Sequence, residues 1–597
     1  MSSLELGLIG NCEIAVLLDS RGRYVWGSFP RMDSDPFFCT LLNGVDEKNA
    51  QCGFFEVELL DVQTIEQRYI HNTAILTTTL RDESGNALNL VDFAPRFEQH
   101  GRSFHPIMVV RQIVPIAGTP AIRIRLRPSA NYGSRRPDMT HGSNHIRFGN
   151  GAFTLRLTTN ASLSSVMEER ALLLEEPINL ILGPDETLMH SPITLGRQMF
   201  DETKAYWENW SRGLSVPFEW QEEVIRAAIT LKLCTFEDTG AVLAALTTSV
   251  PEAPNTGRNW DYRCCWLRDS YYVVQALNRL GTTRTMEQFL RYLFNVIADS
   301  GSGSPLQPVY GISGEATLEE RSVPSLPGYR GMGPVRVGND AYGQVQHDVY
   351  GAVVLAATQL FFDLRLVPTG GQDEWQRLEP LGEQAVKLFD QPDAGIWEFR
   401  GRSQVHTYSS VMCWAAADRL GRIAARLGFG ERAAYWSGKA AEIHAKIVDA
   451  AWNKKRNSFV TTFGGDAIDA SLLTLADLKF VAPDDPRFLG TLAACEAELR
   501  RGCHVFRYAD ADDFGVPQTA FNLCTFWYIG ALAAVGRREE ARELFRNMLQ
   551  HRTALGLLSE DIDPSSGELW GNFPQTYSMV GIIMSAMRLS RTWEEAL

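Results

Sequence analysis

Two parts of different character meet in the 597-residue chain at the stretch Arg197-Gln198-Met199-Phe200-Asp201-Glu202-Thr203-Lys204-Ala205-Tyr206-Trp207-Glu208-Asn209-Trp210. Its apolar residues recur at helical spacing, and Gly213 and Pro217 follow it, so the pattern predicts a connecting helix. The chain before it has the pattern of strands, and the chain after Trp220 that of helices. We therefore expect an N-terminal domain over residues 1–193, a helical linker over 194–218 and a second domain over 219–597.

The first 190 residues predict an antiparallel β-sandwich. Short runs rich in β-branched residues occupy 55–60, 74–80, 107–114 and 153–158, separated by Gly, Pro, Asn and Asp turns. The run Ile122-Arg123-Ile124-Arg125-Leu126-Arg127 alternates strictly, as a strand with one buried face does. We expect its three arginines on the solvated side of a sheet, although they could also be described as a basic patch.

The remaining 380 residues predict about twelve helices, an estimate from apolar periodicity. The expected ranges are 219–237, 270–280, 285–299, 341–366, 375–390, 408–427, 431–451, 467–478, 487–499, 517–535, 538–550 and 574–591. Twelve helices make six hairpins, which close into an all-α (α/α)6 barrel. Long loops at alternate junctions are typical of functional segments.

Composition excludes several classes of protein. The formal net charge is −14 and the sequence pI is about 5.4, which does not suit binding to nucleic acid or to an anionic membrane. The N-terminus carries no signal-peptide pattern, and no apolar run reaches the roughly 18–20 residues of a membrane span. The ten cysteines form no CxxC pair and have no histidines at zinc spacing, so we expect buried free thiols, a cytoplasmic location and no structural metal. No cofactor is expected either, although the chain alone does not show whether the activity requires a metal or phosphate.

Three loop segments concentrate tryptophan, arginine and acidic residues. The first, Arg258–Ser270, suits sugar binding, since an Arg–Asp pair grips hydroxyls and indole rings stack on sugars; alternatively, Asp269 or Ser270 is an ordinary helix cap. In the second, Glu398 stands between Trp397 and Phe399. Partial desolvation there favours a proton-donating acid, whereas a salt bridge to Arg400 would favour the charged form.

The third segment is Leu558–Pro564, followed by Gly571–Gln575. Acidic residues before proline commonly form a solvated turn, but Glu560 could instead stay ionised and deprotonate a water molecule. Two carboxylates on either side of a bond are the minimum for hydrolysing a glycosidic linkage. No GxSxG, Walker A, HExxH or dinucleotide-binding pattern is present, and Gly301–Ser304 lacks the lysine of a phosphate-binding loop.

Seven blocks in order resemble glycoside hydrolase family 15, which includes glucoamylases, glucodextranases and microbial trehalases. The blocks are Leu8–Cys12 with Phe29–Ser34, Asn259–Asp269, Tyr310–Glu315, Pro327–Gly331 with Val335–Asn339, Gly395–Glu398, Ser559–Asp563 and Gly571–Gln575. Two departures are Cys264-Cys265, where many relatives have an aromatic residue before the second Cys, and Tyr577-Ser578-Met579 in place of the commoner Phe-Ser-His.

The resemblance implies a β-sandwich joined to an (α/α)6 barrel, and an inverting mechanism. Carried over by motif, Glu398 is the general acid and Glu560 the general base, and Arg268 and Asp269 hold the non-reducing glucose. Trp266, Trp397, Tyr329 and Arg330 would line the same pocket.

The function this predicts is an inverting, exo-acting α-glucoside hydrolase that releases β-D-glucose from oligosaccharides or small disaccharides, of glucoamylase or trehalase type. The alternatives are a glycoside phosphorylase of related architecture and a non-catalytic carbohydrate-binding protein. The expected partner is an α-linked glucose disaccharide or oligosaccharide. The preferred linkage and the oligomeric state are not readable from the chain.

Overall fold

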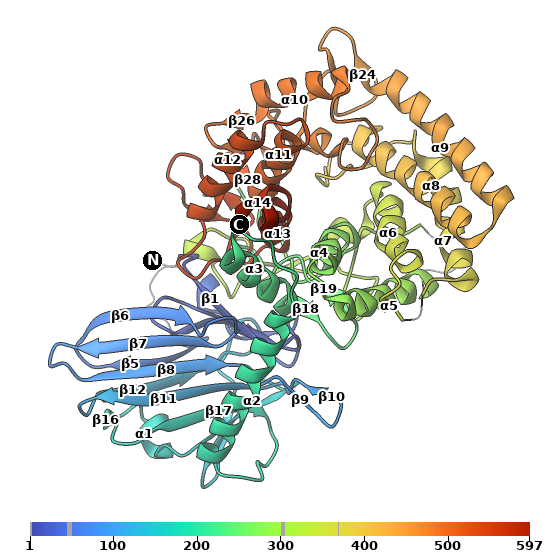
Figure 1. The fold of residues 1–597 in the computed structure, drawn as a ribbon. Helices are drawn as coiled ribbons and strands as arrows, with labels where there is room; N and C mark the ends of the chain where they lie inside the picture. Colours follow the sequence, from blue (N-terminus) through green and yellow to red (C-terminus); the bar gives the residue numbers. More distant parts are fainter. Residues whose placement is uncertain (1–2, 44–50, 300–304, 368) are drawn as a thin grey trace.

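The computed structural model describes residues 3–43, 51–299, 305–367 and 369–597, so the Gly301–Ser304 run lies outside the described residues. Two bodies are visible in Figure 1, a pair of β-sheets and a ring of helices. Helix α2 (Pro192–Arg212) connects them where the apolar periodicity predicts a helix. Within the described part of the chain, no helix has the length and apolarity needed to cross a membrane.

The N-terminal body is a sandwich of two antiparallel sheets, as predicted. The first sheet contains β1 (Gly7–Gly10), β2 (Ala15–Leu18), β3 (Tyr24–Ser28), β4 (Pro36–Phe38), β5 (Phe54–Leu59), β12 (Ala121–Arg127) and β16 (Leu172–Leu173). The second runs in the order β13 (Asp138–His141), β14 (His145–Gly149), β15 (Thr154–Thr159), β17 (Ile178–Pro184), β11 (Val109–Ala117), β8 (Ala87–Phe93), β7 (Leu76–Asp82) and β6 (Val62–Tyr69). The smaller elements are β9 (Phe97–Gln99), β10 (Arg102–Phe104), α1 (Leu163–Met167) and the 3₁₀ helix η1 (Thr40–Leu42).

Strand β12 shows why the alternating run folds as it does. Ile122 and Ile124 are fully buried in the core between the two sheets. On the opposite face Arg123 and Arg125 lie directly across from Glu58 and Glu56 of β5 and pair with them at 2.9 and 3.2 Å. The arginines therefore balance acidic residues of the neighbouring strand, and the basic-patch interpretation is wrong.

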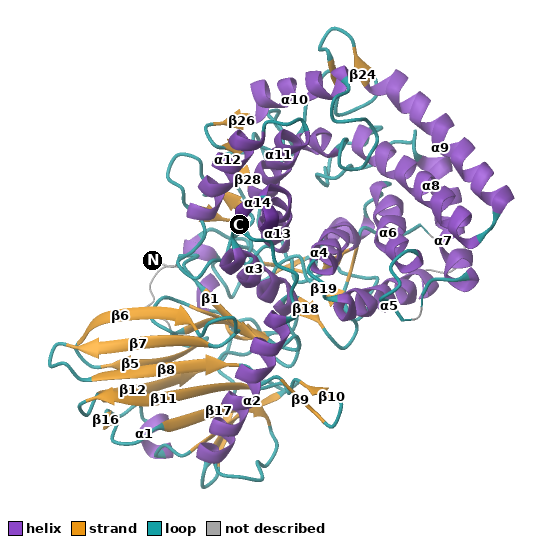
Figure 2. Ribbon diagram, viewed as in Figure 1, coloured by secondary structure: helices purple, strands orange, loops and turns teal. Residues whose placement is uncertain are grey.

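The C-terminal body is the predicted helical barrel, shown as a ring of purple helices in Figure 2. Its helices are α3 (Gln221–Leu233), α4 (Leu267–Arg279), α5 (Thr283–Asp299), α6 (Asp348–Thr358), α7 (Gln372–Leu388), α8 (Thr407–Leu427), α9 (Gly430–Ala451), α10 (Pro486–Leu499), α11 (Asn522–Ala534), α12 (Arg538–Gln550), α13 (Thr576–Leu589) and α14 (Trp593–Ala596). The 3₁₀ helices are η2 (Tyr329–Gly331), η3 (Asp340–Gly343), η4 (Gln359–Phe361) and η5 (Ala470–Thr474).

Short strands lie in the loops between these helices. They are β18 (Thr235–Phe236), β19 (Ala241–Val242), β20 (Cys265–Trp266), β21 (Val309–Tyr310), β22 (Arg321–Ser322), β23 (Arg336–Val337), β24 (Trp452–Asn453), β25 (Ser458–Phe459), β26 (Arg500–Arg501), β27 (His504–Val505), β28 (Ala520–Phe521), β29 (Asp561–Ile562) and β30 (Leu569–Trp570).

An inner circle closes around the barrel axis. Elements α4, α6, α8, η5, α11 and α13 each contact the next, and α13 contacts α4 again. Helices α5, α9, α10 and α12 pack behind α4, α8, η5 and α11, while α3 packs against α13 and α7 against both α6 and α8. Because the inner elements alternate with outer ones along the chain, their N-terminal ends meet on the same rim.

Two predicted helices differ from the structure. The range 467–478 contains only η5, since the side chain of Asp469 accepts hydrogen bonds from the backbone N–H and hydroxyl of Ser471 and so caps a short 3₁₀ turn. The range 341–366 is divided into η3, α6 and η4, with extended residues between η3 and α6. Those residues include Gln344 and Gln346, which turn towards the barrel rim.

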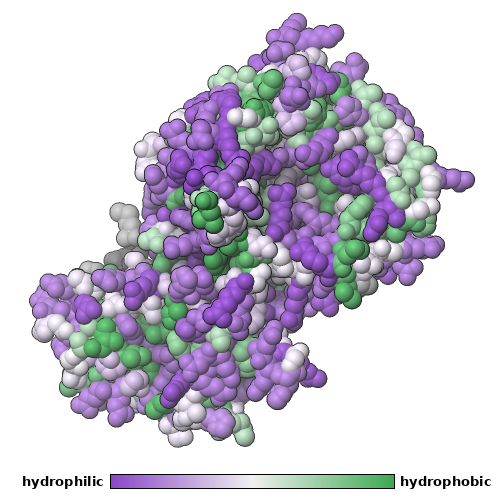
Figure 3. All heavy atoms as spheres, in the orientation of Figure 1, coloured by the Kyte–Doolittle hydropathy of each residue, from purple (hydrophilic) through white to green (hydrophobic). Residues whose placement is uncertain are grey.

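The sandwich and the barrel share buried contacts. The Trp26 indole donates to the Leu246 carbonyl at 2.8 Å, and Arg226 donates to the Thr73 carbonyl at 2.8 Å. One apolar core cluster contains residues of both bodies. All ten cysteines are free, eight of them buried, as the sequence predicts. Hydrophilic residues cover most of the face seen in Figure 3, with hydrophobic ones in scattered groups.

Candidate active site

A cavity opens at the rim where the inner elements begin. Its lining includes the start of α4, the loop before α8, the loop before α11, and the β29 and α13 region. Glu398 and Glu560, which are 162 positions apart in sequence, both line it, and so do Trp266, Arg268, Asp269 and Trp397. The fold therefore gathers six of the eight predicted site residues around one space.

Glu398 sits on a tight turn. Gly395 and Glu398 have φ angles of 69° and 58°, and the left-handed conformation is costly for a residue with a side chain. Its Oε1 accepts hydrogen bonds from the Trp266 indole at 2.7 Å, Gln346 Nε2 at 3.2 Å and Arg268 Nη2 at 3.5 Å. The turn thus places the Glu398 carboxyl group next to three hydrogen-bond donors. The Glu398 side chain remains 24% exposed.

Arg400 does not form the salt bridge to Glu398 that was one of the two alternatives. Its guanidinium pairs with Glu320 at 2.8 Å and lies 4.4 Å from the centroid of the Trp260 ring. Next to Glu398 in sequence, the Trp397 indole donates to Asp469 at 2.9 Å, which ties the turn to the start of η5.

Glu560 lines the same cavity. Its Oε1 accepts a hydrogen bond from the Tyr262 hydroxyl at 2.8 Å, and the Tyr262 and Trp266 rings meet edge to face at 5.3 Å. Since Trp266 donates to Glu398, a chain of two aromatic residues links the two carboxyl groups.

The environment of Glu560 corrects the expectation of a wet turn that keeps it charged. The residue is 1% exposed and precedes β29, which pairs on both sides with β28 and β30. Burial raises the pKa of Glu560 well above its usual value, Glu252 and Asp561 add to the increase, and Arg507 and Tyr262 oppose it. The solvated turn is formed instead by Asp563, whose carboxylate accepts from Ser565 and Ser566.

Arg268 and Asp269 lie in the first turn of α4, and Trp266 is the N-cap, so the helix-cap interpretation of Asp269 is wrong. Arg268 donates to Gln346 at 2.9 Å and to Asp348 at 3.0 Å. Burial raises the pKa of Asp269 to about 7, with Arg268 lowering it and Glu398 raising it. A buried, paired guanidinium and carboxyl at the floor of a cavity offer fixed donors and acceptors to sugar hydroxyls.

Sequence profiles of known families match both bodies. The profile described as "Glycosyl hydrolases family 15" matches residues 220–587, and that described as "Trehalase-like, N-terminal" matches residues 4–169. The chain belongs to glycosyl hydrolases family 15. The recognition made from seven sequence blocks is thereby confirmed.

Similar proteins agree with this family assignment. The trehalase of Thermoplasma volcanium is 33% identical over 605 residues, covering 99% of this chain and 93% of that protein. The trehalase of Mycolicibacterium smegmatis is 32% identical over 626 residues, covering 99% and 92%. A bacterial glucoamylase solved with acarbose shares the fold, with a TM-score of 0.68 at 13% identity over 98% of this chain and 94% of that one. The family 15 protein is an inverting α-glucoside hydrolase, as predicted.

Two predicted pocket residues of this family 15 chain lie elsewhere. Tyr329 is 1% exposed and packs edge to face on Trp570 at 5.9 Å, and Arg330 pairs with Glu568 at 2.7 Å. Neither lines the cavity. Glu568 lies between β29 and β30, so its charge holds Arg330 against that hairpin.

Other residues of the cavity were missed by the sequence analysis. Glu252 and Arg507 form a buried ion pair that lines it, and Tyr262 and Gln575 line it as well. Glu252 stands between two prolines and Arg507 precedes a loop, so neither belongs to a periodic pattern that could be recognised. Tyr262 and Gln575 lie inside two of the sequence blocks that resemble family 15, so the sequence does contain a signal for them.

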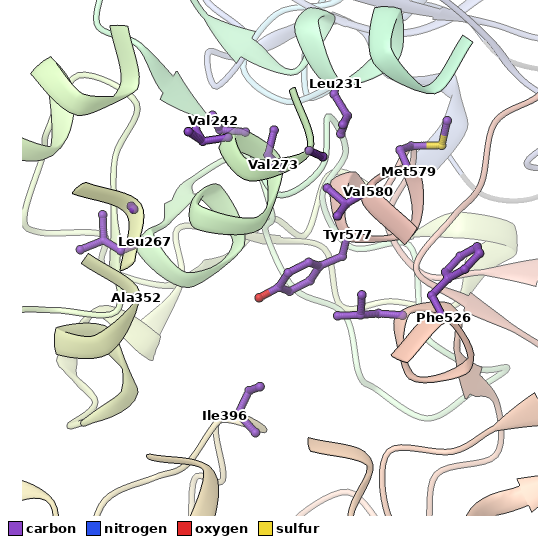
Figure 4. Close-up of a cluster of buried hydrophobic side chains, with 14 of the residues drawn as sticks. Leu231, Val242, Leu267, Val273, Ala352, Ile396, Phe526, Tyr577, Met579 and Val580 are labelled. Atoms are coloured by element: carbon purple, nitrogen blue, oxygen red, sulfur yellow. The ribbon is translucent and has the colours of Figure 1, made fainter. Parts of the chain in front are cut away.

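The structure shows where the residues of Tyr577-Ser578-Met579 lie, the stretch that differs from the commoner Phe-Ser-His of the family. Tyr577 lines the cavity, whereas Met579 is fully buried. Figure 4 shows the Tyr577 oxygen pointing into the central gap on the side of Ile396, while the Met579 side chain extends in a different direction. Met579 therefore belongs to the core and does not line the cavity.

Among the described residues, Glu13, His105 and Asp238 form a group whose ligand atoms lie within 4.8 Å of one another. His105 Nδ1 is 3.6 Å from Glu13 Oε2. None of the three lines the cavity.

Proposed function

We propose that this family 15 hydrolase acts on α,α-trehalose, with Glu398 as general acid and Glu560 as general base. The observation that carries the proposal is that two carboxyl groups from distant parts of the chain line one cavity beside a buried Arg–Asp pair. Trehalose is favoured over longer α-glucans because relatives named trehalase match nearly the full length of the chain.

The reaction is a single displacement. Glu398 gives its proton to the glycosidic oxygen while that oxygen leaves C1, and a water oxygen forms a bond to C1 from the opposite face. Glu560 takes the proton released by the water. Inverting sites hold the two carboxyl groups roughly 6.5–9.5 Å apart to leave room for this water. One glucose is released as the β-anomer and the other as the α-anomer.

The neighbours of each carboxyl group fit these roles. Trp266 and Gln346 orient the carboxyl of Glu398 towards the cavity through hydrogen bonds at 2.7 and 3.2 Å. Tyr262 holds Glu560 at 2.8 Å, and the positive charge of Arg507 favours the ionised form that a base needs. Arg268 and Asp269 would bind hydroxyls of the glucose whose C1 reacts.

A substrate panel tests the substrate. Glucose release would be measured on trehalose, maltose, isomaltose, kojibiose and soluble starch, with the first-formed anomer followed by NMR. We expect the highest kcat/KM on trehalose and equal initial amounts of the two anomers. Release of only α-glucose from trehalose, or a preference for starch, would contradict the proposal.

Amide substitutions test the two roles. We expect Glu398→Gln and Glu560→Gln each to reduce kcat by about 10²–10⁴-fold, the usual contribution of a general acid or base. Glu568→Gln is the matched control, since Glu568 lies on the β29–β30 hairpin outside the cavity and should leave kcat unchanged. Circular dichroism verifies the fold of each variant. Substantial activity in either catalytic variant removes that residue from its role.

A further inference from the structure

The cavity has a buried floor and an exposed mouth. Arg268 and Asp269 at the floor are each 6% exposed, while Arg400 and Asp513 are exposed and Trp260 and Phe514 half-buried. All six line the same cavity. The last four residues come from three loops, before α4, before α8 and before α11, and are named the rim below.

Trp260 is the point where the rim loops meet. The guanidinium groups of Arg400 and Arg336 lie 4.4 and 4.7 Å from its ring centroid, and Phe514 meets it edge to face at 5.2 Å. Its indole N–H donates to Glu252 at 3.1 Å. Glu320, which does not line the cavity, pairs with Arg400 at 2.8 Å and with Arg336 at 3.2 Å. These ion pairs also help to hold the two guanidinium groups over the Trp260 ring.

Asp513 ties the loop that carries Glu398 to the loop before α11. Its Oδ2 accepts hydrogen bonds from the backbone N–H groups of Arg400 at 2.8 Å and of Gly401 at 3.1 Å. A Cβ atom on Gly401 would lie 2.4 Å from Asp513 Oδ1, which shows how closely the two loops approach. On the far side, the adjacent Asp512 pairs with Arg258, which anchors the same loop to the one that carries Trp260.

We infer that the rim is a length filter that admits a single sugar on the leaving-group side of the bond. The inference rests on the proposed function, because it assumes that the reacting glucose occupies the floor. In this arrangement a leaving group of one glucose would occupy the space between the carboxyl pair and the rim. A second sugar on the leaving-group side would have to pass between the two loops that Asp513 joins. Two hydrogen bonds to the Asp513 carboxylate and the packing around Trp260 hold these loops together.

The experiment compares trehalose with α-maltosyl α-glucoside, which is trehalose extended by one glucose, in the full-length enzyme. We expect the wild type to prefer trehalose. Asp513→Ala removes both loop contacts and should raise the ratio of kcat/KM for the trisaccharide over the disaccharide by about tenfold or more, as the loss of charge-assisted hydrogen bonds predicts. The change should appear mainly in KM.

Two variants serve as controls. Asp513→Asn keeps an oxygen that can accept from the same N–H groups and should restore most of the wild-type ratio. Asp510→Ala removes an exposed acidic residue of the same loop that does not line the cavity, and should leave the ratio unchanged. An unchanged ratio in Asp513→Ala overturns the inference. So does an equal loss of kcat on both substrates, since Asp513 would then act only by positioning Glu398.

The failure of the proposed function is distinguishable from the failure of the filter. A wild-type enzyme inactive on trehalose refutes the trehalase proposal, and the ratio is then measured with the disaccharide and trisaccharide of the linkage that is cleaved. A wild type that cleaves both lengths equally well refutes the filter and leaves the trehalase proposal standing.

Discussion

The base candidate Glu560 is held in a cluster of opposing charges. Glu252 and Asp561 raise its pKa together with burial, and Arg507 lowers it. Arg507 itself pairs with Glu252 and lies 3.8 Å from Asp561. The proton affinity of Glu560 therefore depends on how the Arg507 guanidinium is shared among three carboxyl groups, one of which, Glu252, also pairs with Arg258 at 3.9 Å.

Glu252→Gln should shift the acidic limb of the kcat/KM profile to lower pH. The base has to be ionised, so activity rises with pH through its pKa. The substitution removes a negative charge that raises this pKa and releases Arg507 to stabilise the Glu560 carboxylate, so both effects lower it. The measurement is kcat/KM against pH for trehalose. Asp563→Asn, in the exposed turn beyond the same strand, is the control, and a limb displaced to higher pH would contradict this account.

Local patterns predicted the helices and strands better than the loops that carry the site. Most helices and strands lie within a few residues of their predicted bounds because their apolar residues recur at regular spacing, as in β12 and α8. The composition of their loops marked Glu398 and Glu560 as candidates, but each had an alternative interpretation, and only the family motif gave each residue a role. The surroundings of Glu560 could not be predicted at all, because β29 pairs with β28, about 40 positions earlier, and such pairing leaves no local periodic signal.

Close packing between inner helices gives a prediction at the scale of the element. Gly351 of α6 faces α8, where an added Cβ would lie 2.3 Å from the Met412 carbonyl oxygen. Gly351→Ala should therefore destabilise the fold by about 1–3 kcal/mol, although alanine is the better helix former. In contrast, Gly438 of α9 is exposed, and a Cβ atom added to it would have no other atom within 4 Å. Gly438→Ala should therefore stabilise the fold by about 0.4–1 kcal/mol. Urea unfolding measures both, and equal effects would refute the packing argument.

At the scale of the whole molecule, the sandwich is joined to the barrel by buried polar contacts. Arg96 of the sandwich is 1% exposed, donates to the Asn11 carbonyl at 2.7 Å and pairs with Glu237 of the barrel. Burial alone would raise the pKa of Glu237, but Lys232 and Arg96 lower it to about 2. This pair therefore stabilises the fold fully above the ordinary pKa of a glutamate, and the contribution is lost as the pH falls towards 2.

Glu237→Gln should reduce the free energy of unfolding because it leaves the Arg96 guanidinium buried without its countercharge. Removing one partner of a buried pair typically costs about 3–5 kcal/mol, so the variant should unfold at a clearly lower temperature at pH 7. Glu98→Gln is the matched control: Glu98 pairs with Arg284 at 3.6 Å, but both side chains are about 60% exposed, and such pairs contribute about 0–1 kcal/mol. Differential scanning calorimetry measures the unfolding transitions of each variant. We expect one transition in the wild type, since the sandwich and the barrel share an apolar core. A separate unfolding transition of the sandwich at a lower temperature in Glu237→Gln would show that the Arg96–Glu237 pair couples the two bodies. A variant that unfolds like Glu98→Gln would show that the apolar core alone holds them together.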